Sequence, residues 1–368
     1  MPSSVRPSRR SVLAASAALV LGAAGCAQGE SGTGSANAGS GGGSTPGKLA
    51  ALSLDYAYYN PASLVLRDKG WLADALPGTT VSWQFSAGSN KANELLRGNA
   101  VQLGSTAGAA ALLARSNGSP IKIVDVLAQP EWTAVVVGPK STARTIQDLR
   151  GKKIAATLGT DPYFFLLQTL TAAGMTTRDV QVVNLQHADG RTALARGDVD
   201  AWLGLDPIMA AAQVQDGDRL IVRDPGRATY SVLNAREDFA TAHPDVLTAV
   251  LTQYERARTW IEGNQAEAVA ILAREAKLTP AVATTVLRDR TRLTTDPVPG
   301  EAQRAVLTRL LPTFVANKQV GSQADAQTAL ASLFLPDPVR AAVTAAAASP
   351  APAGSGAPSG SPSPSAAS

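Results

Sequence analysis

The sequence predicts an α/β protein of two lobes, in which helices flank mainly parallel sheets. Short apolar strands alternate with helical segments of roughly 10–15 residues. This series occurs twice, and the chain of 368 residues exceeds the roughly 100–200 residues of one domain. Ligands of open α/β sheets bind beyond the carboxyl ends of the strands, so we expect a ligand cleft between the lobes.

The first series opens with the apolar strand 49–56, after which Asn60-Pro61 starts a helix. An Asn at the N-cap followed by Pro at the first helical position is a physical start signal. Helices are also expected at about 90–98 and 106–115. The other strands expected in this series are 79–86, 101–105, 121–127 and 132–138.

The second series contains helices that begin at Asp161-Pro162 and Asp206-Pro207, and the chain is mostly helical after 239. Its expected strands are 152–158, 181–186, 199–205, 219–224 and 229–235. We place the crossovers between the lobes near 132–138 and 229–235. Lobe 1 is then 48–138 plus 231–338, and lobe 2 is 139–230.

The two ends of the chain are expected to lie outside the lobes. Residues 1–25 carry three arginines and then a short apolar run, which is too short to span a membrane and indicates a signal peptide. Residues 26–47 are rich in Gly and Ser and predict a flexible linker. Residues 339–368 consist largely of Ala, Pro, Ser and Gly and predict a disordered tail.

The segment Ala23-Ala24-Gly25-Cys26 resembles a bacterial lipobox, in which the cysteine is lipidated. The chain would then be exported and anchored by lipid to the outer face of the cell membrane. Residues 8–13 resemble a twin-arginine signal, and both this route and the general export route stay open.

Composition and charge exclude several classes of protein. Outside the first 25 residues, 30 Lys and Arg stand against 29 Asp and Glu, so no basic surface for nucleic acid is expected. One cysteine and two distant histidines exclude a disulfide framework and give no metal-ligand spacing. No phosphate-binding P-loop is present, so the chain should not hydrolyse ATP itself. We expect no cofactor.

Small hydroxyl, amide and glycine groups, with aromatics beside them, follow the expected strands. Helix N-termini expose N–H groups and a partial positive charge, so such turns can hold anions. No base, nucleophile triad or metal set accompanies them, so we expect a binding protein and not an enzyme. The candidate ligand-binding residues are Tyr58, Tyr59, Asn60, Ser89, Asn90, Ser105, Thr106, Trp132, Gly159, Thr160, Asp161, Tyr163 and Asp206.

Some of these residues fit a purely structural role equally well. Asn60, Asp161 and Asp206 each precede a proline and are typical N-caps, so capping and ligand contact both stay open. Ser105 and Thr106 fit caps as well. We interpret His187 as a polar residue at a helix start and 288–292 as an exposed helix face.

The chain from about 48 to 320 resembles substrate-binding proteins of ABC importers, in the aliphatic sulfonate, nitrate and taurine family. The segments that carry the resemblance are 86–89, 101–106, 148–155 and 197–202 with Asp206-Pro207. The resemblance implies a type II periplasmic-binding-protein fold, ligand capture by hinge closure and delivery to a permease whose ATPase is a separate chain. It implies a monomer, and it matches Ser89, Ser105-Thr106 and Gly159-Thr160 to oxyanion-binding positions.

The chain departs from this family after Thr160, where Asp161-Pro162-Tyr163 replaces small polar residues. A carboxylate there would compete with an anionic ligand. A zwitterion such as taurine, with its ammonium near Asp161 or Asp206, would reconcile the two features, and so would a thiamine-pyrimidine precursor stacked on Tyr or Trp. The sequence also leaves open nitrate or bicarbonate as the ligand, a thiamine-pyrimidine synthase that uses histidine and iron, and a ligand-free signalling lipoprotein.

Overall fold

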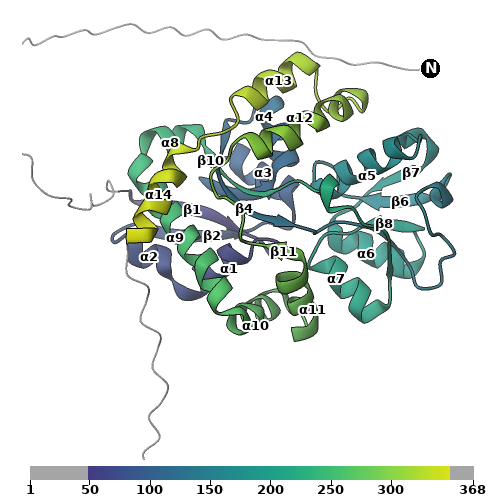
Figure 1. The fold of residues 1–368 in the computed structure, drawn as a ribbon, viewed down its shortest axis with the longest axis horizontal. Coiled ribbons are helices and arrows are strands. Elements are labelled where there is room, and N and C mark those ends of the chain that lie inside the picture. Colours follow the sequence, from purple (N-terminus) through teal and green to yellow (C-terminus); the bar gives the residue numbers. More distant parts are fainter. Residues whose placement is uncertain (1–48, 349–368) are drawn as a thin grey trace, which may run out of the picture. The chain divides into compact units, whose positions relative to one another are not determined.

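The computed structural model describes residues 49–348, and these contain two sheets (Figure 1). The first sheet has six strands in the order β11-β4-β10-β3-β1-β2, and the second has five in the order β7-β6-β8-β5-β9. Both sheets belong to one compact unit of the chain. The expected α/β class is confirmed. The signal peptide 1–25, the lipidation of Cys26 and the linker 26–47 lie outside the described residues.

Each sheet is parallel except at the strand where the chain crosses between the two sheets and at the edge strand β11. The reversed strands are β10 in the first sheet, with the two-residue β11 at its edge, and β5 in the second. The strands are β1 (Ala51–Tyr56), β2 (Thr80–Phe85), β3 (Leu103–Ala107), β4 (Ile121–Pro130), β5 (Val135–Val137), β6 (Lys153–Ala156), β7 (Gln181–Asn184), β8 (Ala201–Leu203), β9 (Arg219–Val222), β10 (Ser231–Arg236) and β11 (Thr291–Arg292).

The reversed strands β5 and β10 lie at the positions where the sequence predicts crossovers, near 132–138 and 229–235. Strand β5 pairs with β8 and β9, for example Val135 with Leu203, so it belongs to the second sheet. The lobe boundary that we placed after 138 is therefore wrong for this strand. The sequence of a short apolar strand does not show which strands it pairs with, because its partners lie far along the chain.

Helices cover both faces of the first sheet (Figure 1). Helices α1, α9, α10 and α14 share one apolar core with it, and α4, α12 and α13 share another that extends to α5. The helices are α1 (Pro61–Lys69), α2 (Trp71–Ala75), α3 (Ser89–Arg97), α4 (Gly108–Ser116), α5 (Asp161–Ala172), α6 (His187–Arg196), α7 (Ile208–Ala211), α8 (Glu237–Ala242), α9 (Pro244–Gly263), α10 (Gln265–Ala276), α11 (Pro280–Thr284), α12 (Glu301–Ala316), α13 (Gln323–Ala331) and α14 (Asp337–Ala348).

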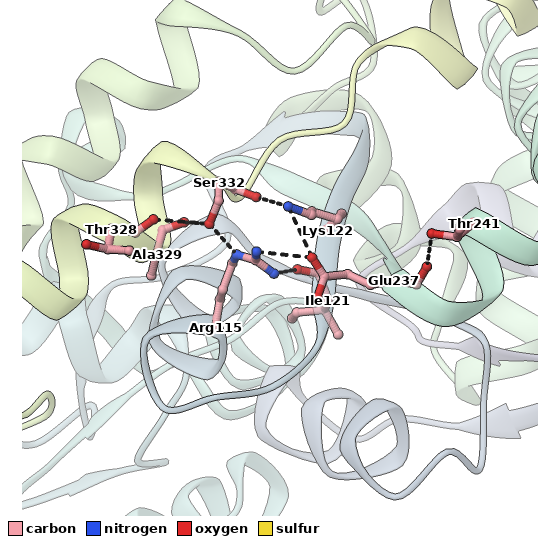
Figure 2. A network of polar contacts seen from close by, with 8 residues as sticks. All are labelled: Arg115, Ile121, Lys122, Glu237, Thr241, Thr328, Ala329 and Ser332. Atoms are coloured by element: carbon pink, nitrogen blue, oxygen red, sulfur yellow. Dashed lines mark hydrogen bonds and ion pairs between the residues drawn. The ribbon is translucent and has the colours of Figure 1, made fainter.

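A polar network joins α13 to the first sheet and to α8 (Figure 2). The guanidinium of Arg115 donates to the Ser332 hydroxyl at 3.0 Å, to the Ile121 carbonyl at 2.7 Å and to the Glu237 carboxylate at 3.1 Å. Lys122 pairs with the same carboxylate at 3.1 Å. One planar donor group thus connects three elements that are far apart in the sequence.

Helix α14 corrects the expected start of the C-terminal tail. The prediction of a disordered tail from 339 is wrong for 339–348, because α14 packs against α9 and buries Val339 and Ala342 completely. Alanine is the strongest helix former, and two buried positions suffice to dock an alanine-rich helix on an apolar face. The rest of the expected tail, 349–368, lies outside the described residues.

We predict that Val339→Asp destabilises the protein by about 3 kcal/mol, because it buries a charge without a partner. Val343→Asp is the matched control, since Val343 lies on the same helix and is 37% exposed. Urea unfolding of the two variants measures the difference. Equal losses of stability would contradict the docking of α14.

Candidate functional site

A cavity of about 670 Å³ lies at the carboxyl ends of four strands from the two sheets. It is lined by residues that directly follow β1, β2, β7 and β8, together with residues of α6, α7 and the end of α10. This is the place at which ligands bind in open α/β sheets. Three of the expected site residues, Tyr58, Tyr59 and Asp206, line it.

One side of the cavity is apolar and aromatic. The rings of Tyr58 and Phe85 lie 4.7 Å apart between centroids, and Phe85 is 44% exposed. Ile208 and Leu278 also line the cavity. An exposed aromatic pair beside aliphatic side chains suits the carbon skeleton of a small organic ligand.

The charged side chains of the cavity are mainly basic. Arg191, Arg196 and Lys277 line it, and among its described lining residues Asp206 is the only carboxylate. Arg191 is paired with Asp216 at 2.7 Å, whereas Arg196 and Lys277 are exposed and form no ion pair within 49–348. We did not expect these cations, because an arginine on an exposed helix is usually only solvated.

The starts of α3 and α6 face each other beside this cavity. The first helical hydrogen bonds of α3 run from Lys91 and Ala92 to the Gly88 carbonyl, which leaves the N–H groups of Ser89 and Asn90 without partners inside the helix. A Cβ at Gly88 would lie 2.9 Å from His187 Nε2 at the start of α6. Glycine is therefore required where the two helices approach.

Three of the predicted turn residues, Ser89, Asn90 and Gly159, lie close to the contact between the starts of α3 and α6. Gly159, in the turn before α5, faces Asn90, whose Cβ lies 3.9 Å from the position of an added Gly159 Cβ. The Oδ1 atom of Asn90 is buried and has no hydrogen-bond partner. The Ser89 hydroxyl accepts a hydrogen bond from the Ala107 N–H at 3.0 Å. These three residues lie together beside the cavity but are not among the residues that line it, and their contact with a ligand stays a prediction.

Ser105 and Thr106 do not lie in a turn as we expected. Both are inside β3, because this strand pairs with β1 on one side and β10 on the other and continues to Ala107. Ser105 donates to Asp55 through its N–H at 2.8 Å and through its hydroxyl at 3.1 Å. Thr106 accepts from Asn234 at 2.9 Å. These two side chains are fully buried and hold the sheet together.

Asp161 is not the N-cap that we considered and is not a free ligand contact. Thr160 is the N-cap residue of α5, and its hydroxyl donates to the Thr157 carbonyl at 2.6 Å. The buried carboxylate of Asp161 accepts from Trp132 Nε1 at 2.9 Å, from the Thr229 N–H at 2.8 Å and from the Thr229 hydroxyl at 2.6 Å. Burial raises the pKa of Asp161, and the Thr229 and Trp132 hydrogen bonds lower it.

Asp206 forms an ion pair between the two sheets. Its carboxylate accepts from Arg290 Nη1 at 3.0 Å and from the Ala210 N–H at 2.9 Å. Burial raises the pKa of Asp206 to about 6, and the Arg290 charge lowers it. The expected exposed face at 288–292 is wrong at Arg290, which is 6% exposed. Arg290 is buried because it ends a π-helical turn directed at Asp206.

The remaining candidates have other roles. Asn60 caps α1 by accepting from the Ser63 N–H at 3.3 Å, as its sequence position predicted. The Tyr59 hydroxyl donates to the Ser105 carbonyl at 2.9 Å, and its ring meets Trp132 edge to face. Tyr163 lines a separate cavity of about 480 Å³ between α5 and the end of α12. Tyr163 is not among the residues that line the 670 Å³ cavity.

Within residues 49–348 there is no group of three His, Cys, Asp or Glu side chains that could hold a metal ion. In the same part of the chain, no helix has the length and apolar character needed to cross a bilayer.

The two sheets, their reversed crossover strands and the cavity at the strand ends define a periplasmic-binding-protein fold. The chain belongs to the NMT1/THI5-like family, whose model matches residues 62–268. It is 28% identical over 278 residues to an Escherichia coli (strain K12) protein provisionally named an aliphatic sulfonates-binding protein, covering 75% of this chain and 86% of that one. It is 30% identical over 207 residues to the taurine-binding periplasmic protein of the same organism, covering 54% and 63%.

Solved structures show the same fold. The alkanesulfonate-binding protein SsuA of Xanthomonas axonopodis pv. citri, solved bound to MOPS, superposes with a TM-score of 0.71 at 25% identity, covering 77% of this chain and 98% of that one. SsuA of Escherichia coli gives a TM-score of 0.68 at 25% identity, covering 78% and 93%. The desulfurization enzyme DszB shares the fold with a TM-score of 0.61 at 15% identity, covering 81% and 99%.

Asp55, at the end of β1, makes a testable contribution to pH dependence. Burial raises its pKa from 3.8 to about 7, while the hydrogen bonds from the Ser105 N–H and hydroxyl lower it. Between about pH 4 and pH 7 the folded protein keeps a proton that the unfolded chain has lost. The associated stability is complete at low pH and is lost as pH rises through about 7.

We therefore predict that the free energy of unfolding of Asp55→Asn declines less between pH 4 and pH 7 than that of the unsubstituted chain. Chemical denaturation across this range measures the difference. Asp189→Asn, at an exposed position of α6, should leave the profile unchanged. A profile of Asp55→Asn parallel to the unsubstituted chain would show that Asp55 does not titrate in this window.

Proposed function

We propose that this chain is the extracytoplasmic solute-binding component of an ABC importer, which captures a small organosulfonate or a related anion. The observation that carries the proposal is the charge of the 670 Å³ cavity. Arg191, Arg196 and Lys277 line it, and its one described carboxylate, Asp206, is neutralised by Arg290. The names of the relatives, which include aliphatic sulfonates and taurine, support the same ligand class.

The cavity combines the two features that an organosulfonate needs. Its basic side chains and the N–H groups at the starts of α3 and α6 attract the anionic head. The aromatic pair Tyr58 and Phe85 offers apolar contact to the carbon chain. The same pair would also accept a flat heterocycle, which keeps a thiamine-pyrimidine precursor as the second candidate.

The mechanism that we propose is closure around the ligand. Residues that follow strands of both sheets line the cavity, so a bound ligand contacts both lobes. Such a ligand favours the closed conformation, in which the two lobes are close together. A membrane permease, with its ATPase on a separate chain, would recognise that arrangement. Within this proposal one lobe consists of 48–134 and 231–348, and the other lobe consists of 135–230. The protein acts as a monomer.

We also propose that lipidation of Cys26 holds the exported protein at the outer face of the cell membrane, with 26–47 as the linker. The proposal assigns binding and not catalysis to the chain. The likeness to DszB concerns the fold alone, and the sequence contains no cysteine after Cys26 and only two histidines.

Calorimetric titration of the purified chain with taurine, ethanesulfonate, MOPS, nitrate and a pyrimidine precursor tests the proposal. We expect a sulfonate to bind, and binding to weaken with added salt because screening acts on exposed charges. Arg196→Gln and Lys277→Gln should each weaken sulfonate binding by about two- to fivefold, which is the effect of an exposed charge.

Arg97→Gln is the matched control, because Arg97 is an exposed arginine on α3 that does not line the cavity. It should bind sulfonates as the unsubstituted chain does. Binding of the pyrimidine alone would favour the second candidate. Unchanged sulfonate affinity in Arg196→Gln and Lys277→Gln would contradict the placement of the anion in this cavity.

A further inference from the structure

Two side chains that line the cavity, His187 and Ser86, are buried and have a polar atom without a hydrogen-bond partner, and His187 is the larger of the two. It is the first residue of α6, it lines the cavity and it is 1% exposed. Its Nε2 atom has no hydrogen-bond partner. A buried polar atom without a partner costs free energy, so the site is complete only when a further group reaches it.

The neighbours of the ring determine what that group must be. The Thr157 hydroxyl donates its hydrogen to the Leu185 carbonyl at 2.7 Å. The contact of 3.1 Å between Thr157 Oγ1 and His187 Nδ1 is then a hydrogen bond in which Nδ1–H donates. In a neutral imidazole the other nitrogen is an acceptor. Nε2 therefore requires a donor.

The ring is neutral under ordinary conditions. Burial lowers the pKa of His187 to about 3, and no charged group opposes this effect. A second unpartnered acceptor, Asn90 Oδ1, lies close by on the facing helix. Nε2 and Oδ1 lie 2.9 and 3.0 Å from one and the same point, the position of an added Gly88 Cβ. The two acceptors therefore lie near each other beside Gly88, so a donor group of a ligand that reaches His187 Nε2 is also close to Asn90 Oδ1.

We propose that His187 Nε2, with Asn90 Oδ1, selects sulfonates whose carbon chain carries an O–H or N–H group over unsubstituted alkanesulfonates. This inference rests on the proposed function. The anionic head meets the basic side chains of the cavity, and the O–H or N–H group donates to His187. A hydroxyl suits the position particularly well, because its oxygen can also accept from a free N–H at a helix start.

Binding of 2-hydroxyethanesulfonate, taurine and ethanesulfonate, which share one chain length, tests this selection in the unsubstituted chain. We expect at least one of the first two to bind about tenfold more tightly than ethanesulfonate, the effect of one satisfied hydrogen bond in a buried site. Equal affinity for all three would overturn the inference and leave the proposed function intact. Binding of none of the three would overturn the proposed function itself.

Two variants of His187 separate recognition from folding. In His187→Asn the side-chain amide can replace Nδ1 toward Thr157 but does not reach the position of Nε2. In His187→Gln the amide reaches that position. We expect the preference to disappear in His187→Asn and to persist in His187→Gln, with ethanesulfonate bound alike by both. If His187→Asn weakens all three ligands equally, His187 contacts the anionic head, and the inference is wrong.

Discussion

The buried carboxylate of Asp161 fixes the place at which the chain crosses between its two sheets. Its partners, Trp132 and Thr229, lie on the two crossover segments, just before β5 and β10. Three donors surround one carboxylate, and hydrogen bonds to a charged group each contribute about 1.5–3 kcal/mol. Removal of any donor would leave buried charge unsatisfied. The cavity depends on this arrangement, because the crossovers set how the strand ends of one sheet face those of the other.

Charged groups near the cavity have two separate tasks. Asp55, Asp161 and Asp206 are buried and have partners within the protein, so they shape the site. Arg196 and Lys277 are exposed and unpaired within the described residues, so they are available to a ligand. The ion pair between Asp206, after β8, and Arg290, before β11, directly connects the second sheet to the first. Removal of one partner from such a buried pair is strongly destabilising, because it leaves an uncompensated buried charge.

Local sequence signals predicted much of the fold. The strand–helix alternation, the Asn60-Pro61 helix start and the crossovers near 132–138 and 229–235 all depend on neighbouring residues. The rule that ligands bind at strand ends placed Tyr58, Tyr59 and Asp206 at the cavity.

The remaining features depend on distant partners. Asp161 is separated by 29 and 68 residues from the donors that occupy it, and Ser105 by 50 from Asp55. No local pattern reveals such pairs. The same holds for Lys277, which reaches the cavity from the end of α10, and for α14, which folds because α9 offers an apolar face.

We propose that ligand binding brings the two sheets closer together, and that Asp161 fixes how they are placed relative to each other. The most direct test is a spin-label distance between Glu94→Cys on α3 and Asp189→Cys on α6, two exposed positions outside the cavity lining, in a chain carrying Cys26→Ser, with and without a bound sulfonate. We predict that ligand shortens the distance and narrows its distribution, and that Asp161→Asn broadens the distribution in both states. A distance unchanged by ligand, or a distribution unaffected by Asp161→Asn, would contradict the account.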